Sequence, residues 1–115
     1  MQSPQEHLKS ILLQKSVRTG TFTLASGKVS DLYVDCRVTA LDPVGATLIG
    51  SIGWDLVEGE ILRQFPEICA IGGMTMGADP ISLAIGMTGA LRKADKMLQV
   101  FTVRKEAKDH GRGRR

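Results

Sequence analysis

The chain of 115 residues is 43% hydrophobic and 23% charged, a balance typical of a single globular domain and not of a disordered chain. No apolar run approaches the roughly 20 residues that span a bilayer, and residues 1–6 do not resemble a signal peptide, so we expect a cytoplasmic protein without a membrane segment. The net charge of +3 is concentrated in residues 100–115, where six Lys or Arg stand against two acids, so we expect one anion site rather than a surface that binds nucleic acid.

A helix signal stands near the N-terminus. Ser3 precedes Pro4, and Glu6 follows three residues after Ser3, which is the pattern of a capping box. Apolar residues then recur at helical spacing, and we predict a helix from Pro4 to about Lys15.

Two β-type runs, residues 22–24 and 32–35, come next. The segment between them, residues 25–31, reads Ala-Ser-Gly-Lys-Val-Ser-Asp and has the composition of a turn. This pattern predicts a hairpin-like β unit.

A second capping pair, Asp42 and Pro43, precedes a long amphipathic pattern. Pro66 disfavours helical backbone in the residue before it, so we predict that this second helix ends by Phe65.

Two apolar runs, residues 68–71 and 97–103, flank a third helix. Asp79 is predicted to cap that helix, which should extend from Pro80 to about Leu91. Because strands alternate with helices, we expect an α/β fold with a parallel sheet and right-handed crossovers.

The segment between the first of these strands and the third helix reads Gly-Gly-Met-Thr-Met-Gly-Ala-Asp-Pro, residues 72–80. We expect Gly72 and Gly73 to close the strand. Glycine lets backbone approach a ligand closely, and a helix N-terminus offers free N–H groups to an anion. The alternative is a tight turn that binds no ligand.

A basic segment follows the last strand. Lys105 and Lys108 are three residues apart, His110 follows two residues later, and Gly111 and Gly113 supply loop freedom. Cations in such a loop suit a polyanionic leaving group such as pyrophosphate. The alternative is a solvated basic terminus.

Cys36 and Cys69 have neither CxxC spacing nor a neighbouring His cluster, so we assign no metal ligand, and we expect no disulfide in a cytoplasmic protein. We expect both to be free thiols that are buried or half-buried.

Three segments in this order and spacing resemble orotate phosphoribosyltransferase, of the type I phosphoribosyltransferase family. They are residues 20–35, the glycine-rich segment 72–80, and Val-Arg-Lys-Glu-Ala-Lys-Asp-His-Gly at residues 103–111. The resemblance implies a phosphoribosyltransferase-type parallel sheet with an N-terminal helix and a β hood, here truncated. It divides a single domain, residues 1–115, into three parts. These are the helix and hood (1–40), the first half of the α/β core (41–103) and a flexible catalytic loop (104–115).

The activity that the resemblance implies is transfer of a phosphoribosyl group from phosphoribosyl pyrophosphate to orotate. The products are orotidine 5′-monophosphate and pyrophosphate, in pyrimidine (UMP) biosynthesis. Mg²⁺ is the implied cofactor and accompanies phosphoribosyl pyrophosphate. The implied assembly is a homodimer in which the catalytic loop reaches the partner subunit's active site, with neither nucleic acid nor membrane as a partner.

The resemblance also implies the site residues. The catalytic ones are Lys105, Lys108 and His110. The substrate-binding ones are Arg104, Lys105, Lys108 and His110 in the loop, Lys28 and Tyr33 in the hood, and Gly73, Met74 and Thr75 in the glycine-rich segment. Ala25 stands where some relatives have a lysine, and Lys28 is expected to replace that charge.

One family signature does not occur in these 115 residues. It is an apolar strand that ends in two acidic residues, followed by Thr-Thr-Gly-Gly. In relatives this signature binds the ribose 5-phosphate, and it lies C-terminal to the catalytic loop. We therefore expect the 115-residue chain to be inactive by itself. The alternative function is a non-catalytic half-domain or assembly module with a residual anion or pyrophosphate site.

Overall fold

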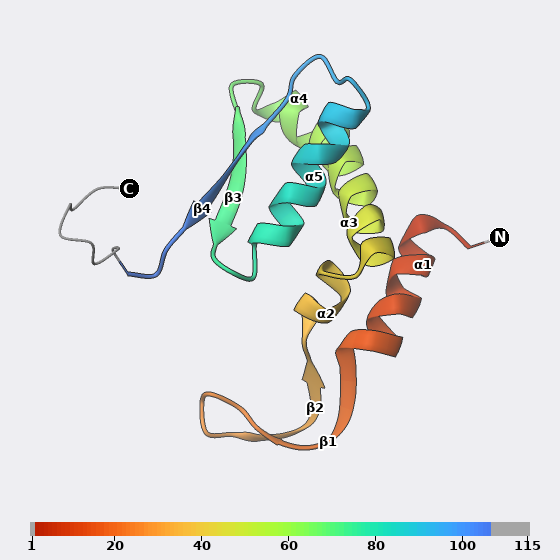
Figure 1. The fold of residues 1–115 in the computed structure, drawn as a ribbon, viewed down its shortest axis with the longest axis vertical. Coiled ribbons are helices and arrows are strands. Elements are labelled where there is room, and N and C mark those ends of the chain that lie inside the picture. The colour runs from red at the N-terminus through yellow and green to blue at the C-terminus, as the bar shows by residue number, and fades with distance from the viewer. Residues whose placement is uncertain (1, 107–115) are drawn as a thin grey trace. The chain divides into compact units, whose positions relative to one another are not determined.

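The computed structural model describes residues 2–106, which form two compact units divided between Leu48 and Ile49 (Figure 1). The first unit contains α1 (Pro4–Ile11), the π-helical segment η1 (Leu12–Ser16), β1 (Val17–Thr23), β2 (Val29–Val34) and α2 (Cys36–Ala40). Helix α3 (Pro43–Leu56) crosses the boundary. The second unit continues with η2 (Val57–Ile61), α4 (Leu62–Gln64), β3 (Ala70–Met74), α5 (Asp79–Leu91) and β4 (Gln99–Val103).

Helix α1 begins as predicted. The Ser3 hydroxyl accepts a hydrogen bond from the Glu6 N–H at 3.1 Å, and the Glu6 carboxylate accepts one from the Ser3 N–H at 3.0 Å. The bond from the Ser3 backbone is the main reason that the pKa of Glu6 lies below its ordinary value. The helical backbone continues through η1 to Ser16, close to the predicted end at Lys15.

Strands β1 and β2 form the predicted antiparallel hairpin, and both are longer than the predicted runs. The register pairs Arg18 with Tyr33 and Phe22 with Ser30, with a bulge between Thr19 and Phe22. A bulge re-aims side chains along a strand, so the local alternation of the sequence does not give this register.

The second helix is confirmed from its cap to its end. Asp42 Oδ2 accepts a hydrogen bond from the Gly45 N–H at 2.9 Å. Helical backbone then continues through α3, η2 and α4 to Gln64, which is the residue before Phe65. The short helix α2 was not predicted; Asp35 caps it by accepting a hydrogen bond from the Arg37 N–H.

Strands β3 and β4 are parallel neighbours, and α5 connects them and packs on both (Figure 1). This arrangement confirms the predicted parallel α/β unit. Its core centres on Trp54, which is 1% exposed and packs with buried Val57 and Leu98. Within residues 2–106, none of the helices has the length and apolar character needed to cross a membrane.

Two local predictions at β3 were wrong. Gly72 and Gly73 lie inside β3 and do not close it, because they pair with Phe101 and Thr102 of β4 and the ladder continues to Met74. The N-cap of α5 is Ala78 rather than Asp79, and no side chain caps this helix.

The prediction for the cysteines was half right. Cys36 and Cys69 are free thiols, but both are exposed. Cys36 begins the short helix α2, and Cys69 precedes β3 and accepts a backbone hydrogen bond from Gln99. Both thiols are therefore exposed at these positions, although cysteine is usually buried in folded proteins.

Candidate functional site

The carboxyl ends of β3 and β4 lie side by side and bring two of the predicted segments together. Met74 pairs with Val103, and the Thr75 N–H donates to the Val103 carbonyl at 2.8 Å. Arg104 and Lys105 follow directly and are exposed. Ligands of open α/β sheets bind at this edge, so the location fits an anion site.

The turn between β3 and α5 contains two backbone donors that no other described residue accepts. The Ala78 N–H donates to the Met74 carbonyl, and the Asp79 N–H donates to the Met76 carbonyl, both at 3.1 Å. Among residues 2–106, the N–H groups of Met76 and Gly77 have no hydrogen-bond partner. A phosphate oxygen that approaches this turn would therefore meet these two amides.

Asp79 holds the turn together in a way that the sequence did not indicate. Its Oδ2 accepts a hydrogen bond from the Thr75 hydroxyl, which joins the start of the turn to the start of α5. Its Oδ1 is buried and has no partner within the described part of the chain. The side chain therefore orders the turn instead of capping the helix.

Glycine at position 73 allows the turn to lie close to the sheet. A Cβ atom at Gly73 would come within 2.7 Å of the Ala78 Cβ, whereas a Cβ at Gly77 would meet no atom within 4 Å. Of the predicted residues in this segment, Gly73 thus has a packing role, while Met74 and Thr75 are exposed at the site.

The predicted residues of the basic loop are only partly described: Arg104 was predicted to bind substrate, and Lys105, Lys108 and His110 to be catalytic. Arg104 and Lys105 lie at the end of β4, as stated above, whereas Lys108 and His110 fall outside the described residues. Within residues 2–106, no three His, Cys, Asp or Glu side chains come close enough together to bind a metal ion.

The hood residues Lys28 and Tyr33 lie in the first unit but not in one place. Lys28 is in the turn of the hairpin, where its carbonyl accepts a hydrogen bond from the Leu24 N–H, and Tyr33 lies near the far end of β2. Arg18, and not Lys28, is the cation opposite Tyr33. No pattern in the sequence indicates this neighbour, because the pairing depends on the hairpin register.

The α/β fold matches about half of the phosphoribosyltransferase fold seen in solved structures. The crystal structure of Mycobacterium tuberculosis H37Rv orotate phosphoribosyltransferase in complex with Fe(III) dicitrate matches with a TM-score of 0.72 and 32% identity, over 95% of this chain and 56% of that chain. The same enzyme in complex with 5-phospho-α-D-ribosyl 1-diphosphate matches with a TM-score of 0.66 and 27% identity, over 90% and 54%.

In sequence, the chain is similar to orotate phosphoribosyltransferases over most of its length. The Rhodopirellula baltica orotate phosphoribosyltransferase is 41% identical over 106 residues, which is 92% of this chain and 54% of that relative. The chain thus spans about half the length of the curated relatives it matches. No protein-family model matches it.

Proposed function

We propose that the chain is the N-terminal half of an orotate phosphoribosyltransferase, with the hairpin as its hood and residues 104–115 as its catalytic loop. The whole enzyme would transfer the phosphoribosyl group of phosphoribosyl pyrophosphate to orotate. The observation that carries the proposal is the edge of β3 and β4, where two amides in the turn after β3 have no partner among residues 2–106 and two cations follow β4.

The chemistry suits this edge. As the bond between the ribosyl carbon and pyrophosphate breaks, negative charge builds on the leaving group. Fixed amides and positioned cations stabilise that charge more in the transition state than in the ground state. Met76 and Gly77 would supply the amides, and Arg104 and Lys105 would supply cations together with Lys108 and His110.

In the proposed reaction, Mg²⁺ would bind together with the substrate and not to the protein alone. The described residues offer no ready-made metal site, so the ion would be bound through the oxygens of phosphoribosyl pyrophosphate. The proposal also includes a cytoplasmic homodimer in which the basic segment of one subunit reaches the partner's site. That part is supported by the resemblance of residues 103–111 to the family's shared loop.

The first test is an assay of the 115-residue chain with orotate, phosphoribosyl pyrophosphate and Mg²⁺, which follows the loss of orotate absorbance. We expect no turnover. Joining the chain to the remaining C-terminal part of the R. baltica relative should produce turnover. A joined chain that folds but stays inactive would contradict the proposal.

In the joined enzyme, Lys105→Gln should lower kcat about 100-fold and leave KM for phosphoribosyl pyrophosphate nearly unchanged, because the cation acts on charge that develops in the transition state. Arg63→Gln is the matched control: Arg63 is an exposed cation on α4, and its loss should change neither constant. A rise in KM at normal kcat for Lys105→Gln would show a role in binding only.

A second candidate, the non-catalytic assembly module, is favoured by one observation. Within the described residues β4 pairs with β3 only and is exposed along its length, so this edge can accept another strand. Pyrophosphate binding by the 115-residue chain, together with an inactive joined chain, would support this candidate.

A further inference from the structure

Thr75, at the start of the turn between β3 and α5, is held at two points. Its N–H donates a hydrogen bond to the Val103 carbonyl at 2.8 Å, which fixes its backbone to the end of β4. Its hydroxyl donates a hydrogen bond to Asp79 Oδ2, which fixes its side chain to the start of α5. The Thr75 hydroxyl therefore already has a partner within the protein.

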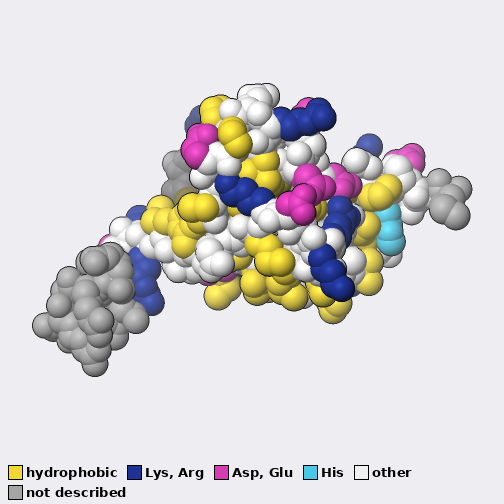
Figure 2. All heavy atoms as spheres, turned by 90° about the horizontal axis from the view of Figure 1, so that it is seen from above, with side chains coloured by type: hydrophobic (Ala, Val, Ile, Leu, Met, Phe, Trp, Pro, Cys, Tyr) yellow, Lys and Arg dark blue, Asp and Glu magenta, His cyan; other side chains and the backbone are white. Residues whose placement is uncertain are grey.

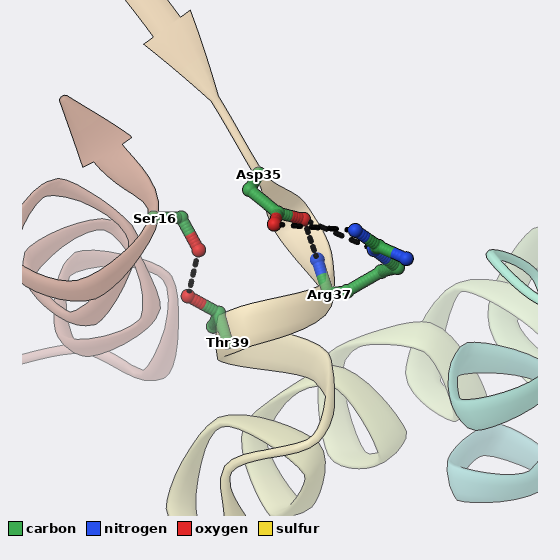
Figure 3. Close-up of polar contacts among 4 residues, drawn as sticks. All are labelled: Ser16, Asp35, Arg37 and Thr39. Atoms are coloured by element: carbon green, nitrogen blue, oxygen red, sulfur yellow. Dashed lines mark hydrogen bonds and ion pairs between the residues drawn. The ribbon is translucent and has the colours of Figure 1, made fainter.

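Asp79 differs from Asp35, another aspartate that stands at the start of a helix. Asp35 Oδ1 accepts a hydrogen bond from the Arg37 N–H at 3.2 Å, so Asp35 uses its carboxylate to occupy a backbone donor of α2 (Figure 3). Asp79 Oδ2 accepts the Thr75 hydroxyl instead, and no side chain caps α5. The carboxylate of Asp79 thus leaves the backbone donors of its turn open.

The bond between Thr75 and Asp79 spans the two amides of the proposed pyrophosphate site. Met76 and Gly77 lie between the bonded residues, and their N–H groups have no partner among residues 2–106. Packing does not fix Gly77, because a Cβ atom there would meet no atom within 4 Å. Glycine has more backbone freedom than any other residue, so without the bond these amides would adopt many orientations.

A carboxylate beside an anion site needs a physical explanation, because like charges repel. Asp79 Oδ1 is buried, and Oδ2 is occupied by the Thr75 hydroxyl. The carboxylate also lies in the first turn of α5, where the helix dipole favours a negative charge. Asp79 therefore acts at this turn through the geometry of its hydrogen bond and not through direct contact with a ligand.

We propose that Thr75 and Asp79 are positioning residues for phosphoribosyl transfer, in which the bond between them orders the amides of Met76 and Gly77 toward the pyrophosphate group. The Thr75 hydroxyl then acts through Asp79 and does not itself contact the substrate. The proposal rests on the proposed function for the identity of the anion. Donors that are ordered in advance need no reorganisation when negative charge develops on the leaving group.

The test is a titration of the isotope-labelled 115-residue chain with inorganic pyrophosphate, followed by NMR on the amide signals of Met76 and Gly77. We expect pyrophosphate to shift both signals. Thr75→Val removes the hydroxyl with little change in volume and should weaken binding about tenfold, as should Asp79→Ala, because the two donors lose their common orientation. Thr75→Ser keeps the hydroxyl and should bind pyrophosphate nearly as well as the unmodified chain.

The double variant distinguishes positioning from direct contact. If the Thr75 hydroxyl acts only through Asp79, adding Thr75→Val to the Asp79→Ala chain should cause no further loss of pyrophosphate binding. Thr47→Val is the matched control, because the Thr47 hydroxyl donates to the Pro43 carbonyl at 2.8 Å within α3, and its loss should leave binding unchanged. Thermal unfolding of each variant shows whether the chain is folded.

The joined enzyme gives a second measurement that a general loss of structure would not reproduce. Thr75→Val should lower kcat/KM for phosphoribosyl pyrophosphate about tenfold, because the ordered amides act on the pyrophosphate group. The KM for orotate should stay unchanged, since these amides do not contact the pyrimidine. Equal losses for both substrates would contradict a positioning role at this turn.

Three results of the titration would overturn the proposal. They are pyrophosphate leaving the Met76 and Gly77 signals of the unmodified chain in place, unchanged binding in Thr75→Val, and a double variant in which the two losses add. Failure of the proposed function has a different signature: the joined enzyme would fold without turnover, while the 115-residue chain still bound pyrophosphate in a manner that depends on Thr75 and Asp79.

Discussion

Individual carboxylates of the first unit fix the junctions between its elements. Asp42 receives a hydrogen bond and ion pair from Lys15 at 2.8 Å, and it also accepts the Gly45 N–H at the start of α3. The contact with Lys15 is the main cause of the lowered pKa of Asp42, and the Gly45 bond is the second. A single side chain thus joins the end of η1 to the cap of α3.

Replacing Asp42 should make the stability of the fold less sensitive to a fall in pH. The folded pKa of Asp42 is lowered, so its contribution is fully present above the unfolded value of about 3.9 and is lost as the pH falls through the lower folded value. Asp42→Ala should therefore lower the melting temperature at pH 7, and the difference from the unmodified chain should shrink below about pH 4.

Thermal unfolding followed by circular dichroism from pH 7 to pH 3 measures this effect. Asp31→Ala is the control, because Asp31 is exposed on β2 and its side chain makes no hydrogen bond with the described residues. An Asp42→Ala deficit that stays constant down to pH 3 would contradict the assignment.

At the scale of elements, α3 and α5 pack closely because glycines face the neighbouring helix. A Cβ atom at Gly50 would lie 2.6 Å from the Ala84 carbonyl oxygen, and one at Gly89 would lie 2.7 Å from the Trp54 ring. Arg92 adds a polar link, with its guanidinium donating to Asp55 at 2.6 Å and to Ser51 at 2.8 Å. The close contact between α3 and α5 therefore depends on glycine at positions 50 and 89, where any side chain would collide with the other helix.

Alanine substitutions separate this packing from helix propensity. Gly50→Ala should destabilise the chain by about 1–3 kcal/mol, because the new methyl group meets backbone that cannot move aside easily. Gly59→Ala should stabilise it by about 0.5–1 kcal/mol, since a Cβ there meets no atom within 4 Å and alanine favours helix. Urea unfolding, read from the fluorescence of the single tryptophan Trp54, compares the two. Equal effects would refute the close-packing explanation.

At the scale of the whole molecule, much apolar surface faces solvent, as Figure 2 shows for one face. On β4 the exposed apolar residues are Val100, Phe101 and Val103, which are 38%, 46% and 42% exposed. Val100 packs near Gly86 of α5, so Phe101 and Val103 point to the opposite face of the sheet. An unpaired strand edge next to an open apolar face favours association.

We therefore expect the 115-residue chain to associate through β4. Its mean sedimentation coefficient should rise with concentration, and Val103→Lys should suppress that rise because a lysine on an edge strand opposes pairing. Gln64→Lys, which adds the same charge on exposed α4, is the control and should change little. A chain that stays monomeric at every concentration would be the contrary result.

The sequence by itself determined the order of the elements except α2, and the limits of the long helices. The capping box at Ser3, the cap at Asp42 and the helix end before Pro66 depend on neighbours within a few residues, and the structure has all three. The alternation of apolar runs with helices likewise indicated the parallel pair β3 and β4. Resemblance to a family added the assignment of Thr75 and Arg104 to one substrate site, and in the structure the Thr75 N–H donates to the carbonyl of Val103, the residue before Arg104.

Only the tertiary structure decided the features that depend on pairing between distant residues. Pairing with β4 carries β3 through Gly72 and Gly73, although glycine is a poor strand residue. The register of a bulged hairpin places Arg18, and not Lys28, opposite Tyr33. The turn geometry directs Asp79 to Thr75. Local propensity cannot encode such contacts, because each is fixed by the strand or turn that lies beside the residue in space and not by its neighbours in sequence.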